Sequence, residues 1–170
     1  QAGDADTRAD GVWTGEPGWP CVVLTADCLP VLLARQDGSA VAAVHAGWRG
    51  LHGGILGRAV ATLAPGGEPL SAWLGPAIFA GAYQVGEDVH RAFVSLGPEY
   101  QAAFSRDSRP NHWRFSLAHA ATLALNAAGV FEVAGGDHCT ASDPVHFYSY
   151  RAEGQTGRFA TMVWLEPAPA

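Results

Sequence analysis

The stretch from Thr25 to Gly50 decides the fold, because it contains the same pattern twice: an apolar strand followed by a polar turn. The first turn reads Thr25-Ala26-Asp27-Cys28-Leu29-Pro30, and the second reads His45-Ala46-Gly47-Trp48-Arg49-Gly50. Apolar runs at 21–24 and 41–44 precede these turns, and a third run at 31–34 lies between them. Short apolar runs bounded by turn residues indicate buried strands. We therefore expect the polar residues at the strand ends, Cys28 and His45 above all, to meet a ligand.

A thiol and an imidazole brought together by neighbouring strands support two kinds of chemistry. One is a metal site, because zinc takes cysteine sulfur and histidine nitrogen, and a catalytic zinc keeps three protein ligands and an open position. The other is a nucleophile pair in which His45 holds Cys28 as a thiolate. A third interpretation needs no ligand: Cys28 is a small buried side chain and His45 a hydrogen-bonded core histidine. The residues alone leave all three open.

The residues behind His45 suggest a place for an anion. Residues 50–63 carry apolar side chains at helical spacing and predict one amphipathic helix. Gly47 and Gly50 lie at its start, where glycines let backbone N–H groups approach an anion and the helix terminus adds about half a positive charge. Arg49 adds a planar donor fork suited to phosphate. A glycine-flanked turn that only caps a helix is the alternative.

The rest of the chain alternates predicted strands and helices. We expect strands at 11–14, 70–74, 131–134, 147–151 and 158–165, the last two closing the sheet. Helices are expected over 86–96 and over 117–128, the second between an N-cap at Ser116 and a stop at Gly129. Residues 97–113 are polar and irregular and predict a mobile insertion, and His90 is expected at the surface. This order of elements indicates an α/β domain.

Composition narrows the possible partners and the compartment. A chain of 170 residues suits one domain with its own core. A net charge of −6 argues against nucleic acid or an anionic membrane surface as the main partner, so an anionic substrate would need local arginines. Three cysteines without CxxC spacing imply no disulfide framework and fit the cytoplasm. No apolar run reaches the roughly 20 residues of a membrane span. The oligomeric state is left open.

Several motifs in order resemble one bacterial family, named at different times multicopper polyphenol oxidase (laccase), peptidoglycan editing factor and zinc-dependent purine nucleoside phosphorylase. The two signature stretches are LTADCLPVLL around Cys28 and AVHAGWRGL around His45. Further matching pieces follow in the same order: 73–78 (WLGPAI), 83–86 (YQVG), 139–140 (CT), 143–144 (DP), 147–151 (FYSYR) and 156–158 (TGR). The resemblance covers nearly the whole chain.

The resemblance implies a layered α/β sandwich, with a mixed β-sheet flanked by helices, and a metal held by one cysteine and two histidines beside a nucleoside pocket. The family's cysteine falls on Cys28 and one histidine on His45. The other histidine belongs to a motif upstream of the stretch resembling residues 3–10 and does not occur in this sequence. We therefore expect residues 1–170 to form a single catalytic domain without the family's N-terminal segment. The implied metal is zinc, with copper implied by the older family name.

The implied activity is phosphorolysis of purine nucleosides such as adenosine, inosine or methylthioadenosine, with adenosine deamination as a further reaction. In this interpretation Cys28, His45 and Arg49 are catalytic. Substrate is bound by Arg49, Gly47, Gly50, Cys139 and Arg151. Partners are then a small nucleoside and phosphate, with neither nucleic acid nor membrane.

Three alternatives stay open. The first is a Cys28–His45 hydrolase or amidase acting on cell-wall peptides, because the fold is shared with a bacterial toxin deamidase that carries such a pair. The second is a copper polyphenol oxidase, which the adjacent His138 and Cys139 invite. Multicopper sites need many histidines, usually in His-x-His pairs, and this sequence has seven histidines and no such pair. We expect His138 and Cys139 to line the pocket or to pack. The third is a non-catalytic metal-binding protein.

Overall fold

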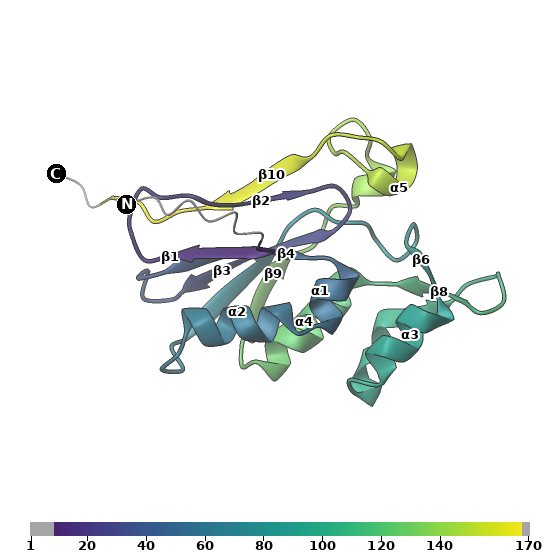
Figure 1. The fold of residues 1–170 in the computed structure, drawn as a ribbon, viewed down its shortest axis with the longest axis horizontal. Coiled ribbons are helices and arrows are strands. Elements are labelled where there is room, and N and C mark those ends of the chain that lie inside the picture. The colour runs from purple at the N-terminus through teal and green to yellow at the C-terminus, as the bar shows by residue number, and fades with distance from the viewer. Residues whose placement is uncertain (1–8, 168–170) are drawn as a thin grey trace.

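The structure, a computed structural model, describes residues 9–167. A five-stranded sheet forms its middle layer, with strand order β1-β4-β3-β5-β9 (Figure 1). Its strands are β1 (Gly11–Thr14), β3 (Leu29–Arg35), β4 (Val41–Ala46), β5 (Leu70–Leu74) and β9 (Glu132–Gly135). Only β5 and β9 run parallel, so the sheet is mixed, and the predicted α/β class is confirmed.

Helices and a β-ribbon cover opposite faces of this sheet (Figure 1). On one face lie α1 (Trp48–His52), α2 (Ile55–Leu63) and α4 (Leu117–Ala127), and on the other lies a ribbon of β2 (Cys21–Thr25) paired with β10 (Phe159–Val163). Strand β4 shows why both layers are needed: Ala42 and Val44 pack with the helices, while Val41 and Ala43 pack under the ribbon. Burial on both faces explains why this strand reads as a continuous apolar run.

A smaller sheet extends the molecule beyond the helical layer. It has the order β6-β8-β7 and carries α3 beside it (Figure 1). The bounds are Gln84–Gly86 for β6, Phe104–Arg106 for β7, His112–Phe115 for β8 and Glu87–Val94 for α3, with a 3₁₀ helix at Pro98–Ala103. Phe93 is fully buried and packs against Phe104 and Phe115, whose rings stack on each other. This aromatic cluster joins the small sheet to the main core, because Phe93 and Phe115 belong to the same buried cluster as the central strands.

Several predictions made from the sequence about secondary structure and burial are wrong in detail. Residues 97–113 form the 3₁₀ helix, β7 and the start of β8, because aromatic side chains of this segment are buried in the core.

Residues 147–151 form no strand. The short helix α5 (Tyr150–Glu153) begins there and is capped by Ser149, whose hydroxyl accepts a hydrogen bond from the Ala152 N–H. Strand β10 pairs with β2 and so does not close the main sheet. His90 is only 12% exposed, because it stacks on Trp113.

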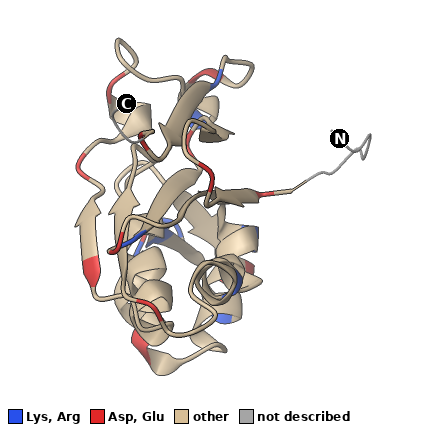
Figure 2. Ribbon diagram, turned by 90° about the vertical axis from the view of Figure 1, so that its left-hand side faces the viewer, with Lys and Arg blue, Asp and Glu red and all other residues tan. Residues whose placement is uncertain are grey.

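Charged residues are scattered over many elements in the view of Figure 2 and do not gather on one face. Within residues 9–167, none of the helices has the length and the apolar character that crossing a membrane needs.

The helix expected over 50–63 is interrupted. It is two helices, α1 and α2, separated by Gly53 and Gly54. Gly54 has φ of 76°, in the left-handed region, so the chain cannot continue one right-handed helix through this point. Apolar spacing alone did not reveal the break, since the buried residues Leu51 and Leu56 lie on both sides of it.

The break predicts opposite effects for two glycine-to-alanine substitutions. Gly57→Ala lies in the interior of α2, where an added methyl group meets nothing within 4 Å. The free energy of unfolding should rise by about 0.5–1 kcal/mol, because alanine loses less backbone freedom than glycine in a helix. Gly54→Ala should lower it by roughly 1–2 kcal/mol, the cost of a left-handed alanine. Urea unfolding measures both, and a Gly54→Ala variant as stable as the parent would contradict the break.

Candidate functional site

The pairing of β3 with β4 brings Cys28 and His45 together. Pro30 lies opposite His45 in this ladder, so Cys28, just before β3, reaches Gly47, just after β4. A Cβ atom placed on Gly47 would lie 3.0 Å from the Cys28 Sγ and 3.8 Å from the His45 Nε2. Both donor atoms therefore face the same small space, and glycine at position 47 leaves that space open.

The other ring nitrogen of His45 is held by Asp10. The His45 Nδ1 lies 2.9 Å from the Asp10 Oδ1, and the His45 backbone N–H donates to the Asp10 carbonyl at 2.7 Å. The pKa of His45 is raised to about 9, first by its hydrogen bond with Cys28 and further by Asp10, against the opposing effect of burial. Asp10 thus fixes the ring through Nδ1 and leaves Nε2 facing the space at Gly47 that the Cys28 sulfur also faces.

These groups open into a cavity of about 490 Å³. Its walls come from five parts of the chain: Leu24 to Cys28, His45 with Trp48 and Arg49, Ile78 with Tyr83, Leu117, and Tyr150 with Arg151 and Arg158. Three of the ten basic residues of this acidic protein line the cavity, and Asp27 is the one acid among the described lining residues. The lining of the cavity therefore carries more positive than negative charge, although the chain as a whole is acidic.

Aromatic rings and carbonyl groups hold the arginines in place. The Arg49 guanidinium lies 4.4 Å from the centre of the Trp48 ring, and the Arg151 guanidinium lies 5.1 Å from the centre of the Tyr83 ring. Arg151 also donates to the Gln84 carbonyl at 3.2 Å. These contacts restrict the side chains before any ligand arrives, which lowers the entropy lost on binding.

Tyr83 stays protonated in this cavity at neutral pH. The pKa of its phenol is raised to about 12, chiefly by burial and also by the nearby Cys28, while Arg151 and Arg49 oppose the rise. Its ring packs against Phe115, which fixes it in the cavity wall. The cavity thus offers a neutral hydroxyl donor and an aromatic face beside its arginines.

The structure gathers most, but not all, of the residues expected from the sequence. Cys28, His45, Arg49 and Arg151 line the cavity, and Gly47 adjoins it. Gly50 lies within α1, which has only five residues. The sequence pattern predicts Gly50 at the start of one long helix over 50–63, whose dipole would attract an anion, and α1 is too short to provide it.

Cys139 and His138 lie apart from the cavity lining. The Cys139 Sγ accepts hydrogen bonds from the Ser142 hydroxyl at 3.3 Å and from the Phe79 N–H at 3.4 Å. Burial opposes ionisation of this thiol, but these bonds outweigh it, and the pKa of Cys139 is lowered. The His138 ring packs against Phe147 at 5.8 Å, so packing is its observed environment.

Sequence reasoning missed Asp10, Tyr83 and Arg158 as parts of this site. Asp10 precedes β1 and meets His45 only through the pairing of β1 with β4, across 35 positions. Tyr83 and Arg158 lie in motifs that carried the family resemblance, which was the available signal. No spacing rule connects such distant positions.

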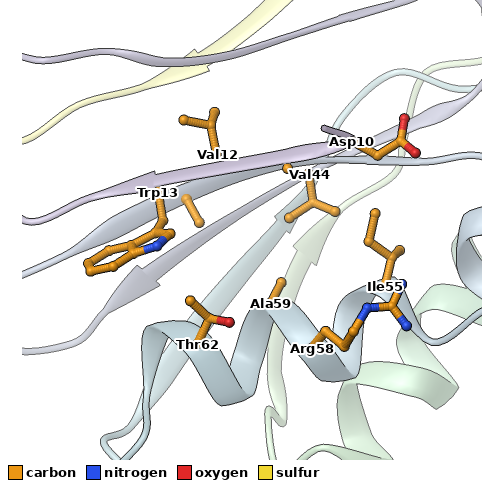
Figure 3. Close-up of a pocket in the computed structure, with 10 residues that line it drawn as sticks. Asp10, Val12, Trp13, Val44, Ile55, Arg58, Ala59 and Thr62 are labelled. Carbon is orange, nitrogen blue, oxygen red and sulfur yellow. The ribbon is translucent and has the colours of Figure 1, made fainter. Parts of the chain in front are cut away.

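A second cavity, of about 390 Å³, lies between the β1–β4 edge and α2 (Figure 3). Ile55 and Arg58 project into it from α2, and Trp13 borders it from β1 (Figure 3). Asp10 lines this second cavity while holding His45 of the first.

The Cys28–His45 pair fits part of a metal site. Sulfur and imidazole are donors that both zinc and copper accept. A carboxylate on the second ring nitrogen, as Asp10 provides, is the usual way in which a metal-bound histidine is oriented. Within residues 9–167 no group of three or more His, Cys, Asp and Glu side chains stands ready to hold a metal. Cys28 and His45 would therefore supply two of the three protein ligands expected for catalytic zinc.

Comparison with known proteins places this architecture in a family. The sequence profile described as multi-copper polyphenol oxidoreductase laccase matches residues 1–166. The chain belongs to this family.

Members of the laccase-like family with similar sequences carry a different name. Purine nucleoside phosphorylases of Pseudomonas aeruginosa and Xylella fastidiosa are 46% and 48% identical to this chain, over 94% of its length. The Escherichia coli K12 purine nucleoside phosphorylase YfiH is 42% identical over 95%.

The chain spans 62–66% of the length of these three family members. Solved structures of the family agree with the fold described above. A Neisseria meningitidis protein superposes with a TM-score of 0.88 at 44% identity, covering 94% of this chain and 65% of its own. YlmD from Geobacillus stearothermophilus superposes with a TM-score of 0.84 at 30% identity, covering 93% and 61%.

The space at Gly47 can be tested by filling it. Gly47→Ala keeps an extended backbone that any residue adopts, with φ of −69° and ψ of 165°, but its methyl group would press on the Cys28 sulfur. We expect slower alkylation of Cys28 at pH 7, because the added methyl group occupies the open space beside the sulfur through which a reagent approaches. Peptide mass spectrometry measures the rate. Gly50→Ala, whose methyl group makes only ordinary contacts, is the control. Equal rates in all three proteins would refute the proposed contact.

Proposed function

We propose that this protein takes part in metal-dependent phosphorolysis of purine nucleosides. The observation that carries the proposal is the joint opening of Cys28, His45 and three arginines into one cavity of about 490 Å³. Such a cavity combines a place for a Lewis acid, a place for an anion and aromatic walls, within the size range of small-molecule sites. The names of the similar proteins support the same activity.

The chain's own residues divide this task. Arg49, Arg151 and Arg158 would bind phosphate, since a guanidinium matches its oxygens with two parallel donors. Trp48, Tyr83 and Tyr150 line the same space and offer faces on which a purine base can stack. The Tyr83 hydroxyl would donate a hydrogen bond to substrate, because its raised pKa keeps it protonated. Phosphate and nucleoside are then held side by side, which removes most of the entropic cost of their encounter.

The metal would be held by Cys28 and His45, with zinc proposed and copper as the alternative. When bound, it would polarise an oxygen of the reactants and so assist nucleophilic attack. Asp10 orients His45 for this role through the Nδ1 contact, leaving Nε2 as the donor atom. Binding requires His45 to release the proton that its raised pKa otherwise retains.

Substrates in this proposal are adenosine, inosine and methylthioadenosine, with deamination of adenosine as a second reaction. The partners are small molecules. A cytoplasmic location is proposed because Cys21, Cys28 and Cys139 are all free thiols.

The central prediction concerns Cys28. With zinc and phosphate present, adenosine should give ribose 1-phosphate and adenine, and Cys28→Ala should abolish this reaction together with stoichiometric zinc binding. Cys21→Ala is the matched control, because Cys21 is buried between β2 and the main sheet and does not line the cavity. Chromatography of the products and metal analysis measure both effects. Zinc-replete protein that leaves a full nucleoside panel unchanged would rule out the phosphorylase assignment.

A second prediction separates anion binding from chemistry. Arg49→Ala should raise the KM for phosphate by about tenfold to a hundredfold, since a hydrogen bond to a charged group is worth roughly 1.5–3 kcal/mol. Arg49→Lys should restore little of this, because lysine lacks the planar donor fork. Arg91→Ala is the control: Arg91 is an exposed arginine on α3, paired with Glu87 and outside the cavity. An unchanged phosphate KM in Arg49→Ala would remove Arg49 from the anion site.

One observation favours a Cys–His hydrolase as the second candidate. Asp10, His45 and Cys28 follow one another as acid, base and nucleophile do in a catalytic triad, and the pKa of His45 is raised by both neighbours. This enzyme would act without metal and form a thioester on Cys28 from a cell-wall peptide amide. Mass spectrometry of the metal-free protein with such a peptide would detect the acyl group, and its presence without nucleoside turnover would favour the hydrolase.

A further inference from the structure

Asp27 has an unusual backbone for a buried residue. Its φ is 88°, in the left-handed region, and only 8% of the residue is exposed. A non-glycine residue in this region is uncommon and is held there by its surroundings, although Asp and Asn adopt it more readily than others. This conformation turns the chain between β2 and β3, immediately before Cys28.

Three oxygen atoms of Asp27 each accept a hydrogen bond from a different part of the chain. The Oδ1 accepts from the Thr140 hydroxyl at 2.6 Å, and the Oδ2 accepts from the Arg151 backbone N–H at 2.6 Å. The Asp27 carbonyl accepts from the Ile78 N–H at 3.0 Å. The two side-chain bonds span 113 and 124 positions of sequence. Asp27 is therefore a junction of four chain segments.

The segments that meet at Asp27 are those that build the candidate site. Cys28 follows it directly, and Ile78 and Arg151 line the same cavity. Asp27 holds the backbone of Arg151, while the carbonyl of Gln84 accepts from its guanidinium. Thr140 is completely buried, so its bond to Asp27 is shielded from water. Short hydrogen bonds to a carboxylate in such a place are strong and leave the joined segments little freedom.

We propose that Asp27 is a positioning residue that couples the two halves of the site: its two carboxylate hydrogen bonds hold the left-handed turn that places the Cys28 sulfur, and one of them fixes the backbone of Arg151 in the cavity wall. The inference rests on the proposed function, which assigns a metal ion to Cys28 and phosphate to Arg151. It adds that the metal-binding half and the anion-binding half depend on one buried side chain, both of whose carboxylate oxygens accept hydrogen bonds from within the protein. Removing the carboxylate should therefore impair both halves together.

Two substitutions at Asp27 separate positioning from backbone strain. Asp27→Gly permits the left-handed turn without a steric penalty but removes the two side-chain bonds that hold the turn in place. Asp27→Asn tolerates the same conformation, and its amide oxygen can accept from Arg151 while its NH₂ donates to the Thr140 hydroxyl. We expect glycine to impair the site and asparagine to restore most of it. Thr140→Val removes one bond alone and should have an intermediate effect.

Three measurements test the metal-binding half and the anion-binding half of the site separately. The rate of Cys28 alkylation in metal-free protein, read by peptide mass spectrometry, reports the position of the sulfur. The thiolate-to-cobalt charge-transfer band reports the same sulfur in cobalt-loaded protein. Isothermal calorimetry with inorganic phosphate reports the arginines. For Asp27→Gly we expect cobalt and phosphate affinities to fall by about 10- to 100-fold, the usual effect of removing a residue that orients a binding group, and the alkylation rate to change.

The control must lose stability without touching the site. Leu125→Ala serves, because Leu125 is fully buried in α4 and does not line the cavity. Loss of stability alone should leave cobalt and phosphate binding unchanged, as measured in Leu125→Ala. Asp27→Gly should lower both affinities. If Asp27→Gly matches Leu125→Ala in all three measurements, or if asparagine restores nothing, the positioning role is refuted. None of the measurements needs nucleoside turnover, so failure of the phosphorylase assignment would be recognised separately.

Discussion

The pairing of β3 with β4 is the constraint on which the rest of the structure depends. Its register sets Pro30 opposite His45, so the turn before β3 and the turn after β4 meet at one end of the sheet. A shift by one residue would turn His45 to the other face, because side chains alternate along a strand. Burial of β4 on both faces resists such a shift, since Ala42 and Val44 pack against helices while Val41 and Ala43 pack against the ribbon.

The site uses this rigid edge and adds positive charge to it through contacts between distant parts of the chain. His45 comes from the sheet and is oriented by Asp10 on the neighbouring chain segment. Arg151 comes from the far end of the sequence and is held by Asp27 and by a carbonyl of the small sheet. An acidic protein thus gathers three arginines in one cavity. Because each is held by ring or carbonyl contacts, the positive charge is already assembled before a ligand binds.

The names laccase and purine nucleoside phosphorylase, both carried by members of this family, describe different chemistry, and the arrangement of donor atoms bears on both. Cys28 and His45 suit zinc and copper alike, and the polar and aromatic cavity beside them suits a purine nucleoside with phosphate. The same atoms, with Asp10, also resemble the acid–base–nucleophile order of a hydrolase. A thiol beside an oriented imidazole serves either chemistry, and the ligand that occupies the space at Gly47 decides between them.

The sequence alone determined the α/β class, the buried strands on either side of the Cys28 turn, the ends of α4 and the family, because apolar runs, caps and ordered motifs are local signals. It also singled out Cys28, His45, Arg49 and Arg151 as residues of interest. The break of 50–63 has a local cause, the left-handed backbone of Gly54 in a Gly-Gly pair, which apolar spacing does not register. Only the tertiary structure decided that Cys139 lies apart from the cavity lining, and that Asp10, Asp27 and Tyr83 belong to the site. Those features arise from contacts between positions far apart in the chain, whose geometry is set by sheet register and packing, and no local pattern of residues encodes them.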